Sequence, residues 1–193
     1  MTTVAIIGAG PLGCWLALGA ARAGYRVFLE DVMPGNLHHA RESIGLELEQ
    51  NQNSGAQAKS PQGGSAVSCD VLPAVAFVST IEDAVRDADL AIDCVPDELE
   101  SKLEILWLLD RMAPPRTVFA TPTAKLSIAD LASCTYRPEK CIAIAAPPAE
   151  LQAGAGPALV LRTAPATNKE TADLVSGFFV KLGFKPAVER VSV

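Results

Sequence analysis

Residues Val4–Asp31 read VAIIGAGPLGCWLALGAARAGYRVFLED, and this stretch decides the fold. Its first four residues, Val4–Ile7, form a short apolar run that is typical of a buried parallel strand. A helix is predicted over Pro11–Gly24, since proline suits the first turn of a helix and glycine suits its end. Arg26–Glu30 is predicted as a second strand. A strand, a glycine-rich turn, a helix and another strand predict the start of a parallel α/β sheet.

The remaining sequence continues the alternation of strands and helices, so we predict a single domain over residues 1–193. The expected fold class is α/β, with a Rossmann-like, doubly wound and mainly parallel sheet. Further strands are predicted over 74–79, 90–95, 117–121, 141–145, 159–162 and 185–191. Further helices are predicted over 34–49, 97–112, 127–133 and 167–182, with a short helix after Thr80. Capping boxes at Thr80 and Thr167 are expected to open two of these helices.

One segment interrupts this alternation. Residues 50–68 are rich in Gly, Ser, Gln and Asn, and their few apolar residues follow no period. Such a composition is typical of linkers and low-complexity segments, so we predict a flexible polar loop at the surface.

Composition and charge exclude several classes of partner. The formal net charge is −6 and no cluster of Lys and Arg stands out, so neither nucleic acid nor an anionic membrane is expected. Residues 4–21 carry no charge, but Pro11 and several glycines argue against a membrane span. The five cysteines include no C-x-x-C pair, which favours free thiols in a cytoplasmic protein without a metal site.

The turn after the first strand carries a phosphate-binding pattern. Gly8–Gly13 reads GAGPLG, which is G-x-G-x-x-G between a predicted strand and a predicted helix. The first glycine permits a tight turn, the second lets the backbone approach a pyrophosphate, and the third lets the helix pack against the strand. The helix N-terminus would then present free N–H groups to the phosphates. The predicted cofactor residues of this turn are Gly8, Ala9, Gly10, Pro11, Leu12 and Gly13.

An acidic residue at the end of the second strand completes the pattern. Glu30 and Asp31 both qualify, and Asp31 falls at the usual register after the strand. A carboxylate there accepts hydrogen bonds from the adenosine ribose and repels a 2′-phosphate. No Arg follows within reach, so we predict NAD(H) as the cofactor in preference to NADP(H). The alternative is a glycine-rich turn that binds no ligand.

The chain resembles the NAD-binding domain of the 3-hydroxyacyl-CoA dehydrogenase family. The resemblance covers most of the sequence, and the order and spacing of its segments match. These segments are VAIIGAGPLG (4–13), ARAGYRVFLED (21–31), DADLAIDCVPDELESKLEILWLLDRMAPP (87–115), ATPTAKLSIADLA (120–132) and RPEKCIAIAAPP (137–148). The resemblance implies an oxidoreductase fold, NAD as the cofactor, and a role in fatty acid metabolism.

The resemblance also extends the predicted cofactor site. Val95-Pro96-Asp97 matches a V-x-E stretch that the family places beside the nicotinamide, with Asp in place of Glu. Lys102 matches a family lysine of the cofactor and CoA region, and Thr121 opens the run that corresponds to the family's T-N-T-S-S-L. For Asp97 and Lys102 the alternative is a solvated first turn of a helix.

The residues that carry the family's chemistry are replaced here. The family's general base is a His after the sixth strand, and Ala145 takes its position. Val160 aligns with the Glu that orients this His, and Pro122 and Ala124 replace an Asn and a Ser of the substrate site. Alanine cannot transfer a proton. The resemblance further implies a helical arm, where this chain has residues 50–68, and a helical C-terminal domain, which we expect to be missing beyond Val193.

Three hypotheses about function follow. In the first, the chain binds NAD(H) without standard 3-hydroxyacyl-CoA dehydrogenase activity: it senses NAD(H), regulates a partner or is a relic, and its candidate partners are another protein or further copies in a homo-oligomer. In the second, it is an active NAD-dependent oxidoreductase with another substrate or proton-transfer group. In the third, it is a structural subunit that binds no cofactor. Candidate proton-transfer groups for the second hypothesis are Asp97, Thr123, Lys125 and Glu150.

Overall fold

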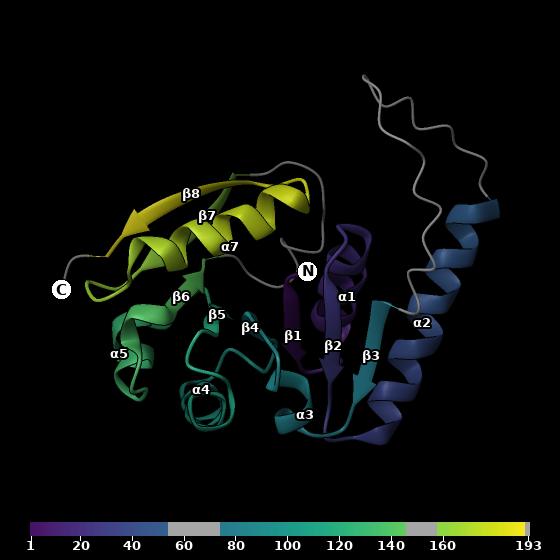
Figure 1. Ribbon diagram of the computed structural model, residues 1–193, viewed down its shortest axis with the longest axis horizontal. Helices are drawn as coiled ribbons and strands as arrows, with labels where there is room; N and C mark the ends of the chain where they lie inside the picture. The colour runs from purple at the N-terminus through teal and green to yellow at the C-terminus, as the bar shows by residue number, and fades with distance from the viewer. Residues whose placement is uncertain (54–73, 146–157, 192–193) are drawn as a thin grey trace.

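The computed structural model describes residues 1–53, 74–145 and 158–191. They form an eight-stranded sheet with the strand order β3-β2-β1-β4-β5-β6-β7-β8 (Figure 1). The strands are β1 (Thr3–Ile7), β2 (Arg26–Glu30), β3 (Val75–Val78), β4 (Leu90–Asp93), β5 (Val118–Pro122), β6 (Cys141–Ile144), β7 (Ala158–Thr163) and β8 (Lys185–Arg190). All neighbouring strands are parallel except β6 and β7. The prediction of a mainly parallel sheet is confirmed.

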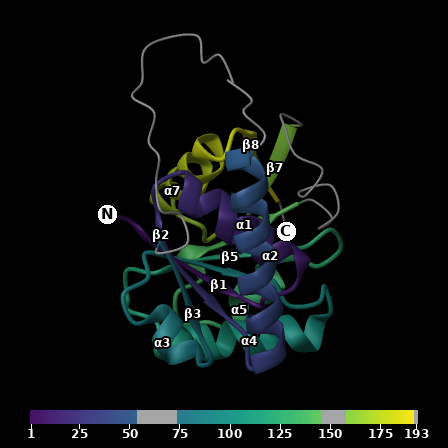
Figure 2. The ribbon, with the colours of Figure 1, turned by 90° about the vertical axis from the view of Figure 1, so that its right-hand side faces the viewer.

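Helices cover both faces of the sheet, as the doubly wound prediction requires. The helices are α1 (Pro11–Arg22), α2 (Pro34–Asn53), α3 (Ile81–Val85), α4 (Leu99–Met112), α5 (Ile128–Ser133), α7 (Lys169–Lys181) and a 3-10 turn, η2 (Pro138–Lys140). Side chains alternate along each strand, so Val4 and Ile6 pack with α1, α2 and α7 on one face, and Ala5 and Ile7 pack with α3, α4 and α5 on the other (Figure 2). Among the described residues, no helix has the length and apolar character needed to cross a membrane.

Two helix caps test the predicted capping boxes. Thr80 caps α3 as predicted: its Oγ1 accepts from the Asp83 N–H at 3.2 Å and donates to the Asp83 carboxylate at 2.8 Å. The prediction for Thr167 is wrong, because Asn168 caps α7 by accepting from the Thr171 N–H at 2.8 Å. Thr167 Oγ1 instead donates to the Cys141 carbonyl at 2.8 Å, which ties the turn after β7 to β6.

Several predicted boundaries shift by a few residues. Helix α2 continues to Asn53, so the predicted loop is wrong at residues 50–53, and the rest of that loop lies outside the described residues. Strand β4 ends at Asp93 and α4 begins only at Leu99, which leaves a loop of five residues between them. This loop lies at the carboxyl edge of the sheet, where ligands of such folds bind.

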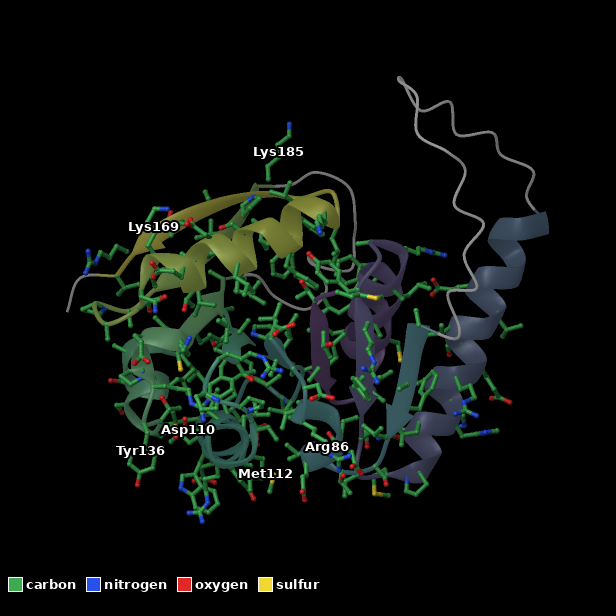
Figure 3. The ribbon with its side chains drawn as sticks, in the orientation of Figure 1. Arg86, Asp110, Met112, Tyr136, Lys169 and Lys185 are labelled. Carbon is green, nitrogen blue, oxygen red and sulfur yellow. The ribbon has the colours of Figure 1, made fainter. Side chains whose placement is uncertain are left out.

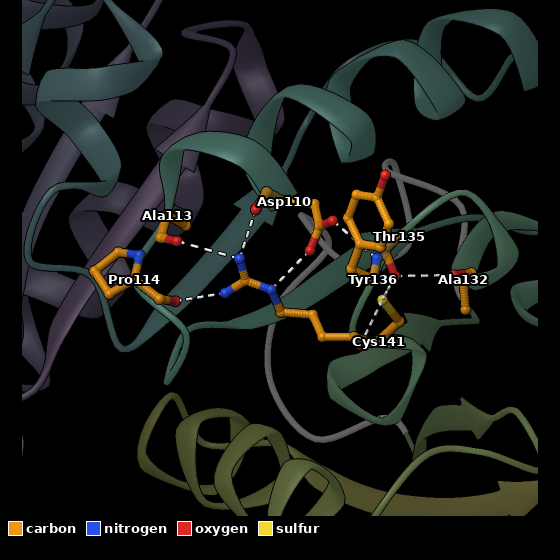
Figure 4. A network of polar contacts seen from close by, with 8 residues as sticks. Asp110, Ala113, Pro114, Ala132, Thr135, Tyr136 and Cys141 are labelled. Atoms are coloured by element: carbon orange, nitrogen blue, oxygen red, sulfur yellow. Dashed lines mark hydrogen bonds and ion pairs between the residues drawn. The ribbon is translucent and has the colours of Figure 1, made fainter.

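A buried ion pair fixes the far end of α4 (Figure 4). Arg137 Nε donates to Asp110 Oδ1 at 2.7 Å, and its other nitrogens donate to the carbonyls of Asp110, Ala113 and Pro114. The same carboxylate accepts from the Tyr136 N–H at 2.8 Å. The Tyr136 ring itself is 93% exposed and points away from the sheet (Figure 3). The network therefore joins α4 to the segment after α5.

Two glycines of the turn between β1 and α1, Gly8 and Gly13, leave no room for a side chain. Gly8 has φ +104°, a conformation that glycine adopts without the strain that a Cβ would cause. A Cβ on Gly13 would lie 1.9 Å from the Gly8 carbonyl oxygen. Helix α1 thus sits directly against the end of β1, as predicted for the third glycine of the pattern.

Gly13→Ala should destabilise the fold by about 2–4 kcal/mol, because backbone must move to relieve the contact. Urea unfolding measures the free energy. Gly177→Ala is the matched control in a second helix, since a Cβ there meets nothing within 4 Å. It should be neutral or stabilising by up to about 1 kcal/mol. Equal stability of the two variants would contradict the close packing of α1.

Glu30, at the end of β2, is a buried carboxyl. It is 5% exposed, and no described residue gives it a hydrogen bond or an ion pair. Burial and, to a lesser extent, the neighbouring charge of Asp31 raise the pKa of Glu30 to about 7. The unfolded chain releases this proton near pH 4.5, whereas the folded chain keeps it until about pH 7. The folded state therefore loses stability as the pH rises between these two values, and the loss is complete above pH 7.

Glu30→Gln should remove this loss, because the amide does not titrate. At pH 8 the variant should exceed the original chain in free energy of unfolding by about 2–3 kcal/mol, and near pH 4.5 the two should agree. Urea unfolding at both pH values measures the difference. Glu104→Gln, an exposed carboxyl on α4, is the control and should show no such change. A gain for Glu30→Gln that is the same at both pH values would disprove the shifted titration.

Candidate dinucleotide-binding site

A cavity of about 620 Å³ lies at the carboxyl ends of β1, β4 and β5. Most of the predicted cofactor residues line it: Gly8, Gly10, Pro11, Leu12, Asp31, Val95, Pro96 and Asp97. A cavity of similar size, about 600 Å³, lies at the opposite edge of the sheet beside Thr2, Leu90 and Arg116. It contains none of the predicted residues. The first cavity is the candidate site, because doubly wound sheets bind ligands at the carboxyl ends of their strands.

The glycine turn forms the floor of this cavity. A Cβ on Gly10 would meet nothing within 4 Å, so the space beside Gly10 is open to a ligand. Gly10 is also the N-cap of α1, and no side chain caps that helix. The N–H groups of the first turn are therefore available to an anion, and the helix dipole favours negative charge there. The turn fits the pyrophosphate of a dinucleotide.

The structure separates the roles of the two adjacent acids. The Asp31 carboxylate faces the turn: Oδ2 accepts from the Ala9 N–H and Oδ1 from the Met33 N–H, both at 2.9 Å. Asn36 Nδ2 donates to both oxygens, at 3.0 and 3.1 Å. Glu30, the last residue of β2, is buried and does not line this cavity. Asp31 is thus the acid at the cavity, as predicted.

Lys102 and Thr121 lie behind the cavity and do not line it. The Lys102 side chain has no exposed surface, and its Nζ lies 2.7 Å from Oδ1 of Asp93, which is equally buried. The alternative of a solvated lysine is therefore wrong, and the predicted role of Lys102 toward the cofactor stays a prediction that no cavity contact supports. Burial raises the pKa of the Asp93 carboxyl, and the Lys102 ammonium opposes that effect. Thr121, at the end of β5, is 1% exposed.

Three buried oxygens near this end of the cavity have no hydrogen-bond partner among the described residues. They are Asp93 Oδ2, Asp97 Oδ1 and Thr121 Oγ1, and all belong to the carboxyl ends of β4 and β5 or the loop after β4. The other Asp97 oxygen accepts from the Ala124 N–H at 3.0 Å and so joins the loops after β4 and β5. Buried polar groups without partners are rare, and they concentrate here, where a polar ligand or water can satisfy them.

The two positions aligned with the family's His and Glu lie side by side. The Ala145 N–H donates to the Val160 carbonyl at 2.8 Å, between the antiparallel strands β6 and β7. Their side chains, a methyl and an isopropyl group, cannot titrate. Glu150, a candidate substitute, lies outside the described residues. Thr123 Oγ1 accepts from the N–H groups of Lys125 and Leu126, so this hydroxyl holds the turn before α5.

Two residues that line the cavity, Asn36 and Cys94, were missed from the sequence. Asn36 follows Asp31 by five residues, and it contacts Asp31 only because the chain bends as it enters α2. Cys94 directly follows β4, so its place at the carboxyl edge could have been inferred. Burial raises the pKa of the Cys94 thiol well above its usual range, which makes it a poor nucleophile. Within the described ranges, no group of three or more His, Cys, Asp or Glu residues could hold a metal.

Comparison with known proteins agrees with this geometry. Residues 3–189 match the family described as 3-hydroxyacyl-CoA dehydrogenase, NAD binding domain. A probable 3-hydroxybutyryl-CoA dehydrogenase of Bacillus subtilis is 29% identical over 72% of this chain and 46% of its own length. An L-carnitine dehydrogenase of Oceanobacillus iheyensis is 31% identical over 97% of this chain and 57% of its own length. The chain thus spans about half the length of these relatives.

Solved structures share the fold. A diketoreductase, described as catalysing reactions of dicarbonyl compounds, has 25% identity and a TM-score of 0.83 over all of this chain and 65% of its own. A 3-hydroxybutyryl-CoA dehydrogenase of Escherichia coli K12 has 24% identity and a TM-score of 0.82 over 98% of this chain and 38% of its own. The glycine turn, the placement of Asp31 and the family match over nearly the whole sequence lead to one conclusion: the chain belongs to the 3-hydroxyacyl-CoA dehydrogenase family as its NAD-binding domain.

Proposed function

We propose that the chain binds NAD(H) in the cavity at the carboxyl edge and does not use the family's His–Glu pair to oxidise 3-hydroxyacyl-CoA. The observation that carries this proposal is the contact between Ala145 and Val160, which lie at the aligned positions and hold no ionisable group. NAD, when bound, would supply a hydride acceptor for a carbon that bears a hydroxyl group, and the hydroxyl proton would need an acceptor among the protein's own groups. Neither of these two side chains can be that acceptor.

Within this proposal, the chain's own residues hold the cofactor. The first turn of α1 binds the pyrophosphate through its N–H groups. Asp31 accepts hydrogen bonds from the adenosine ribose, and Val95, Pro96 and Asp97 face the nicotinamide half. Lys102, Asp93 and Thr121 support that half from behind. The four described cysteines are free thiols, which supports a reducing, cytoplasmic compartment. A partner chain, either a second copy or another protein, would complete any substrate site.

A second function is an NAD-dependent oxidoreductase with a substrate other than an acyl-CoA. Two observations favour it. Asp97 lines the cavity, and its Oδ1 is buried without a partner among the described residues, so it is placed to accept a proton. The L-carnitine dehydrogenase also matches 97% of the chain, whereas the 3-hydroxybutyryl-CoA dehydrogenase of B. subtilis matches 72%. The third hypothesis, a subunit without cofactor, receives no support from the open glycine turn.

Calorimetric titration with NADH and then NADPH tests the proposed binding. The original chain should bind NADH in the micromolar range and NADPH more weakly. Gly10→Val should abolish binding, because its side chain fills the space beside the turn, yet it should keep the unfolding midpoint, since a Cβ there meets no protein atom within 4 Å. If a folded Gly10→Val protein bound NADH with unchanged affinity, the glycine turn would not be the binding site. No binding by the original chain would refute the proposal.

Ala145→His should not restore oxidation of 3-hydroxybutyryl-CoA. The new imidazole would lie beside Val160, which cannot orient its ring or stabilise its charge, so proton transfer would stay inefficient. NADH formation at 340 nm measures the reaction, and the double variant Ala145→His/Val160→Glu is the matched comparison. Turnover by the unmodified chain, or by the single variant, would show that the two replacements do not silence the site.

A further inference from the structure

We propose that Asn36 is a specificity-determining residue of the cofactor site, which together with Asp31 recognises an adenosine ribose without a 2′-phosphate. The inference rests on the proposed binding of NAD(H) at this cavity. It concerns a residue that neither the glycine pattern nor the family resemblance pointed to. Asn36 lies in the first turn of α2, and its side chain is exposed at the cavity.

The hydrogen bonds of Asn36 determine which way its amide faces. Nδ2 lies 3.0 Å from Asp31 Oδ1 and 3.1 Å from Asp31 Oδ2. Only the NH₂ group can approach a carboxylate in this way, because an amide oxygen would be repelled. One N–H of Asn36 points between the two Asp31 oxygens, and this bifurcated bond orients the amide. Its Oδ1 has no partner among the described residues and remains free to accept.

The result places two kinds of acceptor side by side. Asp31 contributes an ionised carboxylate and Asn36 contributes a free amide carbonyl, and the two groups are in direct contact. A ribose hydroxyl is a donor and can bond to either group. A 2′-phosphate is an anion, so the Asp31 carboxylate repels it. Its oxygens are also acceptors and cannot form a hydrogen bond with the acceptor oxygens of Asp31 and Asn36. No Lys or Arg lines this cavity to compensate the charge.

The position of Asn36 strengthens this discrimination. Asn36 lines the candidate cavity and also a neighbouring cavity of about 580 Å³ between α1 and α2, which contains His39 and Ser43. The Asn36 amide thus forms part of the boundary between the two spaces, next to Asp31 on the side of the candidate cavity. A 2′-phosphate directed at Asp31 would have to displace this boundary to reach the second cavity. The backbone N–H groups of Ala9 and Met33 hold Asp31 in place from the other side.

Asn36→Leu tests the proposal, because leucine keeps the shape of the side chain and removes both polar atoms. We expect the Kd for NADH to rise about five- to tenfold and the Kd for NADPH to stay unchanged or to fall, so that the preference for NADH narrows. Isothermal titration of both cofactors measures the two constants. His38→Leu is the control on the same helix, since His38 is exposed and lines neither cavity.

A double-mutant cycle separates recognition from a merely structural role. In an Asp31→Ala background the amide loses the partner that orients it, so Asn36→Leu should then change the Kd for NADH less than about twofold. Asn36→Leu should keep the thermal unfolding midpoint of the original chain, and in the Asp31→Ala background it should keep the midpoint of the Asp31→Ala single variant. An unchanged NADH-to-NADPH preference in Asn36→Leu, or an equal effect in both backgrounds, would overturn the role of Asn36. Absence of NADH binding by the original chain would instead overturn the proposed function together with this inference.

Discussion

The structure depends on the close approach of α1 to the end of β1. The Gly13 backbone lies so near the Gly8 carbonyl that a single methyl group would overlap it. This contact sets the direction of α1, and its first turn then points its N–H groups into the cavity. The same geometry brings the Ala9 N–H within 2.9 Å of Asp31, so one backbone contact aligns both the anion-binding turn and the acid.

Much of this arrangement could be predicted from sequence because it depends on local patterns. Apolar runs of four to six residues mark the strands, and glycines mark the turn, since no other residue fits there. The cap of α7 shows the limit: Thr167 and Asn168 both suit an N-cap, and only the distant Cys141 carbonyl draws Thr167 away.

The part of the site that could not be predicted depends on contacts between distant segments. Lys102 looks like a surface residue in sequence, yet α4 lays it against Asp93 of β4, where each charge makes burial of the other tolerable. In the sequence, Asn36 is simply a polar residue near the start of a helix. In the structure, the bend before α2 places its amide against Asp31. Ala145 and Val160 are apolar residues in apolar strands, and only the antiparallel pairing of β6 and β7 shows that they face a shared position.

The bond between Asp97 and the Ala124 N–H has a mechanical consequence. It fastens the loop after β4 to the loop after β5, although the two segments are separated by the whole of α4 and β5. Asp97 is also one of the groups that a molecule entering the cavity would meet. A hydroxyl or amide that donates to the other oxygen, Oδ1, would hold the same side chain from the cavity side. Occupancy of the cavity and the stiffness of its rim are thus linked through a single side chain.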